Sequence, residues 1–158
     1  MAREAESKQL LYAMTSGHTA GSSDIAGIAV IIKAARHHTL RKISATVPTN
    51  DRITAAYEAI SAALREAREM GARALIVYTD CEAVIGQLNR TVTVGREQLA
   101  RHLETRCLLN QFHRAEVAPV APAQNEAARR LAVEAWQREV EGGGSRQLEL
   151  PMAAGGAS

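Results

Sequence analysis

The sequence is poor in aromatic residues, because tyrosine, phenylalanine and tryptophan together make up 3% of its 158 residues. Folds that bind single strands by stacking bases need rows of aromatic side chains, so this composition argues against them. The two cysteines, Cys81 and Cys107, lie far apart and form no Cys-x-x-Cys pair. We therefore expect neither a zinc site nor a disulfide framework, and a reducing cytoplasm as the compartment.

Long apolar segments and common binding signatures are also missing. The longest apolar run, Ile25–Ile32, is far too short to span a bilayer, and the polar N-terminus lacks the apolar core of a signal peptide. No Walker A loop, Gly-x-Gly-x-x-Gly, His-Glu-x-x-His or Gly-x-Ser-x-Gly motif occurs. We therefore expect a cytoplasmic protein with no membrane partner.

The chain has the length and composition of one ordinary domain. Hydrophobic residues make up 46% and charged residues 23%, which is enough for a sizeable core. The net charge of +2, from 19 basic and 17 acidic residues, neither requires nor excludes a polyanionic partner.

Apolar patterning predicts an α/β fold with a five-stranded mixed sheet flanked by helices. Three short-linked strands come first, which favours antiparallel pairing, and the later strands alternate with helices, which favours parallel pairing. The expected strands cover 9–14, 25–33, 36–46, 74–79 and 112–118, and the expected helices lie between 51 and 71, from 81 to about 88, and over 96–110 and 124–140. In the helix over 96–110, spacing predicts that Leu99, Leu103 and Cys107 face inward.

Composition divides the chain into three parts. Residues 1–8 form a polar leader, 9–140 the folded domain, and 141–158 a tail. Three glycines and a serine over 142–145 predict a flexible linker at the start of that tail.

Five short stretches, in this order, resemble the ribonuclease H family. That family ends its first strand in Tyr-Thr-Asp-Gly, opens its first helix with Thr-Asn-Asn-x-x-Glu and ends its fourth strand in Thr-Asp-Ser. The second strand reads Ala-Gly-x-Gly-Val-Val-Ile, and the last helix begins Asn-x-x-Ala-Asp-x-Leu-Ala. The corresponding stretches here are Tyr12–Thr15, Ala26–Ile32, Thr49–Thr54, Tyr78–Cys81 and Asn125–Ala132.

The resemblance implies a site in which four acidic residues hold two Mg²⁺ or Mn²⁺ ions beside the scissile phosphate. These positions correspond here to Met14, Thr54, Asp80 and Arg129, of which only Asp80 is acidic. A thioether is a poor ligand for a hard cation, and a guanidinium repels it. We therefore expect no metal cofactor and a catalytically degenerate member of the family.

Two other acidic residues are candidates for a rearranged metal site. Asp24, in the loop between the first two strands, can approach the site left by Met14, and Glu126 lies one turn before Arg129 on the same face of the last helix. Their presence keeps an active ribonuclease H that cleaves the RNA strand of RNA/DNA hybrids as the alternative.

Nucleic-acid contacts are the second implication of the resemblance. In the family the Thr-Asn-Asn stretch touches the hybrid, and Thr49 and Asn50 match it, whereas Asp51 departs by charge. Arg129 can pair with a phosphate directly. Other readings remain open: Thr49 and Asn50 as helix caps, Asp80 as the N-cap of the next helix, and Arg129 as a solvated helix residue.

The tail carries a second short resemblance. Gln147, Leu148, Leu150, Pro151 and Met152 match the peptide Gln-Leu-x-Leu-Pro-Leu by which bacterial replication and repair proteins dock on the DNA sliding clamp. Such a peptide must be reachable, which suits a chain end behind a glycine linker. These residues can also pack back onto the domain or have no role.

Together these patterns favour a nucleic-acid-associated accessory protein, binding an RNA/DNA hybrid or duplex and tethered to the clamp. The two alternatives are the active ribonuclease H and a scaffold that binds only proteins. Fold alone does not choose among them, because one fold hosts many functions.

Overall fold

Five strands form a mixed sheet, as the sequence predicted, and their order in the sheet is β3-β2-β1-β4-β5. The computed structural model describes residues 10–35 and 38–153, with side chains described as far as Gly142. Antiparallel pairing joins β1 to β2 and β2 to β3, and parallel pairing joins β1 to β4 and β4 to β5. The strands are β1 (Leu10–His18), β2 (Ala26–Lys33), β3 (Thr39–Val47), β4 (Ala74–Thr79) and β5 (Arg114–Pro119).

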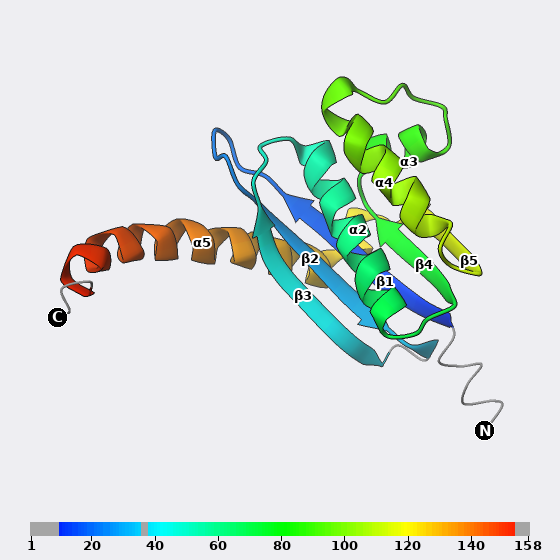
Figure 1. Ribbon diagram of the computed structural model, residues 1–158, viewed down its shortest axis with the longest axis horizontal. Coiled ribbons are helices and arrows are strands. Elements are labelled where there is room, and N and C mark those ends of the chain that lie inside the picture. The colour runs from blue at the N-terminus through cyan, green and yellow to red at the C-terminus, as the bar shows by residue number, and fades with distance from the viewer. Residues whose placement is uncertain (1–9, 36–37, 154–158) are drawn as a thin grey trace.

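Helices cover both faces of the sheet (Figure 1). On one face, α2 packs against β1, β2 and β4, and α4 packs on α2. On the other face, α5 crosses β2, β1 and β3. The helices are α2 (Arg52–Glu69), α3 (Glu82–Leu88), α4 (Leu99–Leu109) and α5 (Glu126–Ala153), with 3-10 turns η2 (Arg96–Gln98) and η3 (Pro122–Gln124). No helix in the described ranges is both long and apolar enough to cross a membrane.

Strand β2 lies between β3 and the central strand β1, and both its faces are covered. Every residue from Ala26 to Ile32 is buried, which explains why its sequence is a continuous apolar run. Two glycines permit the close approach of helices. A Cβ on Gly17, in β1, would lie 2.8 Å from the backbone carbonyl carbon of Ala55 in α2, and a Cβ on Gly27 would overlap the backbone of α5 at Ala132.

The predicted inward face of α4 is wrong. Leu99 and Leu103 are 47% and 52% exposed, and Cys107 is exposed, whereas polar His102 and Thr105 are buried. The reason lies in α2, whose buried surface carries hydroxyl groups that need partners. Tyr57 meets His102, with 2.9 Å between its hydroxyl and Nδ1, and Ser61 meets Thr105 at 3.3 Å.

Helix α5 continues farther than the prediction, which ended it at Val140. Its helical backbone runs to Ala153 and includes the glycines over 142–144 that the sequence suggested as a linker. Glycine disfavours a helix by only ~1 kcal/mol per residue, and good helix formers follow at 146–150. The leader over 1–8 lies outside the described residues, as do the side chains of the predicted docking peptide over 147–152.

Candidate functional site

The parallel pairing of β1 and β4 brings two strand ends together. Met14 pairs with Tyr78, so two residues farther along each chain lead to Ser16 and Asp80. Side chains two residues apart share a face of a strand, which puts Ser16 on the same side as Met14 but at the strand end. Ser16 is only 6% exposed.

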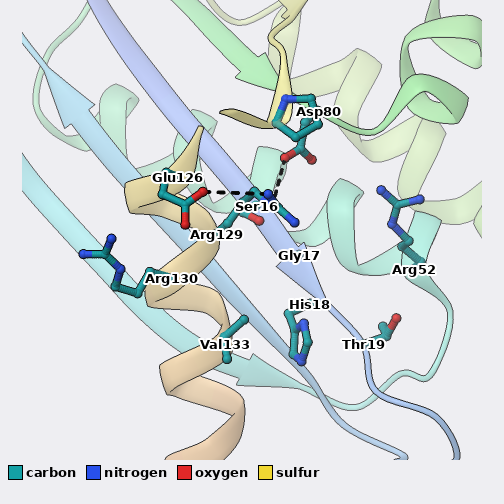
Figure 2. A pocket seen from close by; sticks show the side chains of 11 residues that line it. Ser16, Gly17, His18, Thr19, Arg52, Asp80, Glu126, Arg129, Arg130 and Val133 are labelled. Atoms are coloured by element: carbon teal, nitrogen blue, oxygen red, sulfur yellow. Dashed lines mark ion pairs between the residues drawn. The ribbon is translucent and has the colours of Figure 1, made fainter. Parts of the chain in front are cut away.

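A cleft of about 410 Å³ opens at this end of the sheet, between β1, α2 and the start of α5 (Figure 2). Its walls come from four segments that are distant in sequence. These segments contribute three arginines and two carboxylates to the lining, so the net charge of the cleft is positive at neutral pH. Its lining consists of Ser16, Gly17, His18, Thr19, Arg52, Asp80, Pro122, Glu126, Arg129, Arg130 and Val133.

Arg129 lies between the two carboxylates of the cleft (Figure 2). Its Nε is 3.8 Å from Oδ2 of Asp80, and its Nη1 is 3.9 Å from Oε1 of Glu126. The Asp80 side chain is 12% exposed, whereas the Arg129 side chain is 49% exposed. The guanidinium therefore neutralises a recessed carboxylate while keeping an open side toward the solvent.

Asn125 fixes the other side of Asp80. Its Nδ2 donates to the carbonyl oxygen of Thr15 at 2.8 Å and to Oδ2 of Asp80 at 3.2 Å. Asn125 is 1% exposed, and its Oδ1 has no hydrogen-bond partner among the described residues. A buried amide held in this way joins the start of α5 to the ends of β1 and β4, which sets the position of Arg129 one turn later.

His18 closes the cleft at the end of β1. Its ring meets the ring of Trp136 edge-on, with 5.5 Å between the ring centroids, and the Trp136 Nε1–H donates to Ser23 at 3.1 Å. Burial lowers the pKa of His18, so this wall is neutral at neutral pH.

Ser16 lines the cleft together with Gly17 and His18 of β1, whereas Met14 does not. The sequence comparison placed the family's first acidic position at Met14 because Tyr12 was matched to the tyrosine of Tyr-Thr-Asp-Gly. A register shifted by two residues matches Thr15 and Gly17 to the threonine and glycine of that motif, and puts Ser16 at the aspartate. The signal was missed because Thr15–His18 has the composition of a turn, whereas β1 extends to His18.

Two other predicted positions lie away from the cleft. Thr54 is buried and donates its hydroxyl to Oδ2 of Asp51 at 2.6 Å, so it is not among the lining residues. Asp24 is exposed in the loop before β2 and does not line the cleft either, which removes it as a substitute ligand. Glu126 does line the cleft, as the helical spacing predicted.

The first residue of α2, Arg52, lines the cleft, whereas Thr49 and Asn50 in the segment before it do not. Asp51 is the N-cap of α2, because its Oδ2 accepts from the Thr54 backbone N–H at 2.8 Å. Thr49 supports this cap by accepting the Asp51 backbone N–H at 3.0 Å. Asn50 is exposed and open to contacts.

The suggested capping role of Asp80 is wrong. The N-cap of α3 is Cys81, which makes no side-chain capping bond. The carboxylate of Asp80 points into the cleft instead (Figure 2). Arg129 is an exposed helix residue, as one reading of the sequence has it, and it also pairs with Asp80 and Glu126.

A buried chain of hydrogen bonds starts at the α2 cap. Gln98 Nε2 donates to Oδ2 of Asp51 at 2.9 Å, Gln87 Nε2 donates to Gln98 at 3.4 Å, and the Tyr57 hydroxyl donates to Gln87 at 2.6 Å. Arg106 Nε donates to Nε2 of His102 at 3.0 Å, so that nitrogen is the acceptor and Nδ1 carries the proton toward Tyr57. All these hydrogen bonds therefore run in one direction, from the Arg106 guanidinium to the Asp51 carboxylate, and this alignment strengthens each bond.

The pKa values along this chain follow from its geometry. Burial would raise the pKa of Asp51, but hydrogen bonds from Thr54 and Gln98 outweigh it and hold that pKa below its ordinary value. Burial, with the positive charges of Arg106 and Arg90, lowers the pKa of His102. Burial, with the nearby Cys81 thiol, raises the pKa of Tyr57 to about 12, against a smaller opposing effect of Arg106. At neutral pH each of these three groups therefore has one protonation state: Asp51 is ionised, and His102 and Tyr57 are neutral.

Acidic and other metal-binding side chains do not cluster in this structure. Among the described residues, no three of histidine, cysteine, aspartate and glutamate come together in a way that could hold a metal ion. In the cleft, Asp80 and Glu126 are the two carboxylates, and Arg129 pairs with both. This donor set fits a phosphate or another oxyanion better than a divalent cation.

Comparisons with known proteins agree with this architecture. The family model described as reverse transcriptase-like matches residues 14–135. No curated protein sequence matches the chain.

Three solved structures illustrate the likeness, each under 25% identical. The N-terminal RNase H domain of a Mycobacterium tuberculosis protein is 23% identical, with a TM-score of 0.77 over 85% of this chain and 98% of that one. RNase H1 from the halophilic archaeon Halobacterium salinarum is 24% identical, with a TM-score of 0.76 over 81% and 98%. LC11-RNase H1 from compost, solved with an RNA/DNA hybrid, is 21% identical, with a TM-score of 0.74 over 83% and 98%. The chain therefore belongs to the reverse transcriptase-like family and has the ribonuclease H fold.

Proposed function

We propose that this protein is a non-hydrolytic member of the ribonuclease H family that binds nucleic acid through the cleft at the ends of β1 and β4. The observation that carries the proposal is the position of Arg129, which lies between Asp80 and Glu126. The guanidinium occupies the space between these two carboxylates, where a divalent cation would have to bind, and it presents a donor to a phosphate.

The chemistry of the cleft argues against a divalent metal. Two-metal hydrolysis requires several carboxylates converging on the ions. Here Ser16 stands where a further carboxylate would be needed, and Asp80 is engaged by Arg129 and Asn125. A bound divalent cation would also be repelled by the Arg129 charge, so the residues present do not fit a metal centre.

Three arginines support binding of a polyanion instead. Arg52 lines one side of the cleft from α2, and Arg129 and Arg130 line the other side from α5 (Figure 2). Guanidinium groups bind phosphate through paired N–H donors. LC11-RNase H1, which has this fold, was solved with an RNA/DNA hybrid, and we propose a hybrid or duplex as the ligand here.

Salt-dependent binding tests this part of the proposal. Binding of a fluorescent RNA/DNA hybrid should weaken as salt rises, and Arg129→Gln should lower the slope of log K against log salt by about one. Arg73→Gln, at an exposed residue beside β4, is the matched control and should leave the slope unchanged. Binding that ignores salt and Arg129 would favour the protein-binding scaffold.

One observation favours the active enzyme as a second candidate. Asp80 and Glu126 lie in the same cleft, so two hard oxygen donors are present. Displacing Arg129 toward solvent would free both of them. Cleavage of a hybrid that depends on Asp80 is the result that would establish this candidate.

The tail adds a proposal that rests on sequence. We infer that residues 147–152 dock on a bacterial sliding clamp and raise the local concentration of the protein at DNA. The segment is helical in the structure, so docking in an extended form requires unwinding, which the glycines over 142–144 make inexpensive. Leu148→Ala with Leu150→Ala should abolish clamp binding, and Glu149→Ala should not. Equal binding by all three proteins would contradict the tether.

A further inference from the structure

A second cavity, of about 460 Å³, lies between the end of α3, the loop that follows it, and α4. It is separate from the cleft at the strand ends, because no residue lines both. Figure 1 shows α3 and α4 close together, with the connecting loop above them. The lining consists of Gln87, Arg90, Thr91, Val92, Thr93, Val94, His102, Leu103 and Arg106.

The charge of this cavity is positive. Arg90 and Arg106 both line it, and none of the described residues that line it is acidic. Both arginines lie close enough to His102 for their charges to lower its pKa. Two guanidinium groups around a common hollow repel each other, and an anion between them would relieve that repulsion.

Arg106 is held so that part of its guanidinium stays available. Its Nε donates to His102 at 3.0 Å, and its Nη2 donates to the carbonyl oxygen of Leu88 at 2.9 Å. A guanidinium has five N–H donors, so three remain without a partner among the described residues. The two bonds fix its plane in advance, which lowers the entropy cost of holding a ligand.

Arg90 has a backbone conformation that is unfavourable for its side chain. Its φ is 63°, which makes it the one non-glycine with positive φ among the described residues. It follows the C-cap Asn89 of α3, at the position where helices most often have glycine. The Thr91 N–H bonds to the Gly86 carbonyl at 2.9 Å, which closes this helix end in the left-handed manner.

Packing does not explain the arginine at this position. Arg90 is exposed, and its side chain has no hydrogen bond or ion pair among the described residues. A glycine would form the same helix end without strain. Strain retained at an exposed residue indicates that the side chain has a function, and this side chain borders the cationic cavity.

We propose that this cavity is an oxyanion site, in which Arg90 and Arg106 bind a phosphate group. The Thr93 hydroxyl, on the loop between them, can add a neutral donor. The phosphate is that of a nucleic-acid backbone or a free phosphate, and the two sources share the same contacts. The site is independent of the cleft that contains Arg129, so each can exist without the other.

The test is a titration of the full chain with inorganic phosphate, followed by NMR of the backbone amides and arginine Nε groups. Saturable shifts at Arg90, Thr93 and Arg106 are expected. Arg90→Gly should weaken phosphate binding at least about tenfold and also raise the melting temperature in phosphate-free buffer, because it removes the strain. Arg73→Gln is the control and should behave as the native chain does.

Each outcome has a defined meaning. Phosphate binding that Arg90→Gly removes, in a variant that melts at a higher temperature, supports the site and rules out unfolding as the cause. No saturable shift, or equal phosphate affinity in Arg90→Gly, overturns it. Displacement of bound phosphate by an RNA/DNA hybrid would identify a backbone phosphate as the source, and retention of phosphate beside bound hybrid would identify free phosphate.

Discussion

Arg129 Nε lies 3.8 Å from Oδ2 of Asp80, and this ion pair joins the first turn of α5 to the end of β4. Because the arginine side chain is half exposed, this ion pair contributes little to stability. Its effect is on the chemistry of the cleft, since it converts a carboxylate-centred site into one with a net positive charge.

Replacing Ser16 and Arg129, which line the cleft, and Thr54, at the family's second acidic position, with carboxylates should create a metal site. In the variant Ser16→Asp, Thr54→Glu, Arg129→Asp, the new carboxylates at 16 and 129 would lie in the cleft beside Asp80 and repel it. Mg²⁺ should then bind and raise the melting temperature by ~3–6 °C at about ten times its Kd. The native chain should show no such increase.

The matched control tests which β1 residue belongs to the site. Met14→Asp, combined with the same two changes at Thr54 and Arg129, places the new carboxylate outside the cleft lining. This control should show no Mg²⁺-dependent stabilisation. An equal response from the Met14 and Ser16 variants would mean that the position of Ser16 has no special role.

The end of β1 is also the part of the site that the sequence did not predict. The order of strands and helices, the buried β2 and the position of Asp80 were predictable, because apolar periodicity and short motifs specify them locally. The end of β1 was not, since Thr15, Ser16 and Gly17 have turn-like composition. They remain in the sheet because β2 pairs with all three, the Thr15 hydroxyl donates to the carbonyl oxygen of Tyr78 in β4, and Gly17 lets α2 approach.

The interior of α4 was unpredictable for a different reason. Helical periodicity assigns Leu99 and Leu103 to the core, because it weighs each side chain separately. The structure instead buries His102, whose two ring nitrogens are engaged by Tyr57 of α2 and by Arg106 one turn farther along α4. Such a network becomes visible only when α2, α3 and α4 are placed together.

Tyr57→Phe should destabilise the protein. The tyrosine hydroxyl bonds to Gln87 at 2.6 Å and to His102 at 2.9 Å, and both partners are buried. Removing it leaves both without that bond, at a cost of about 1–3 kcal/mol in the free energy of unfolding. Urea denaturation measures this cost, and Tyr12→Phe, at a half-buried tyrosine, should change stability by less than about 0.5 kcal/mol. Similar values for the two variants would contradict the hydrogen-bond chain.

Stability should fall on mild acidification because of His102. Its pKa in the folded protein is below its ordinary value of 6.5, so the unfolded chain binds the proton more readily. The contribution of neutral His102 to stability is fully present above pH 6.5, and this contribution is lost as the pH falls from 6.5 through the folded pKa. Between about pH 7.5 and about 5.5, the urea midpoint of the native chain should drop more than that of His102→Gln. Parallel pH dependences would show that His102 does not titrate in this way.

The central claim is that this member of the ribonuclease H family does not hydrolyse nucleic acid, and one assay tests it most directly. The native chain and Asp80→Asn, prepared identically, are incubated with an RNA/DNA hybrid in Mg²⁺ and in Mn²⁺. The identical preparation controls for traces of a host ribonuclease H. The account predicts no cleavage by the native chain beyond that of Asp80→Asn. Cleavage by the native chain that Asp80→Asn abolishes would contradict it and establish an enzyme.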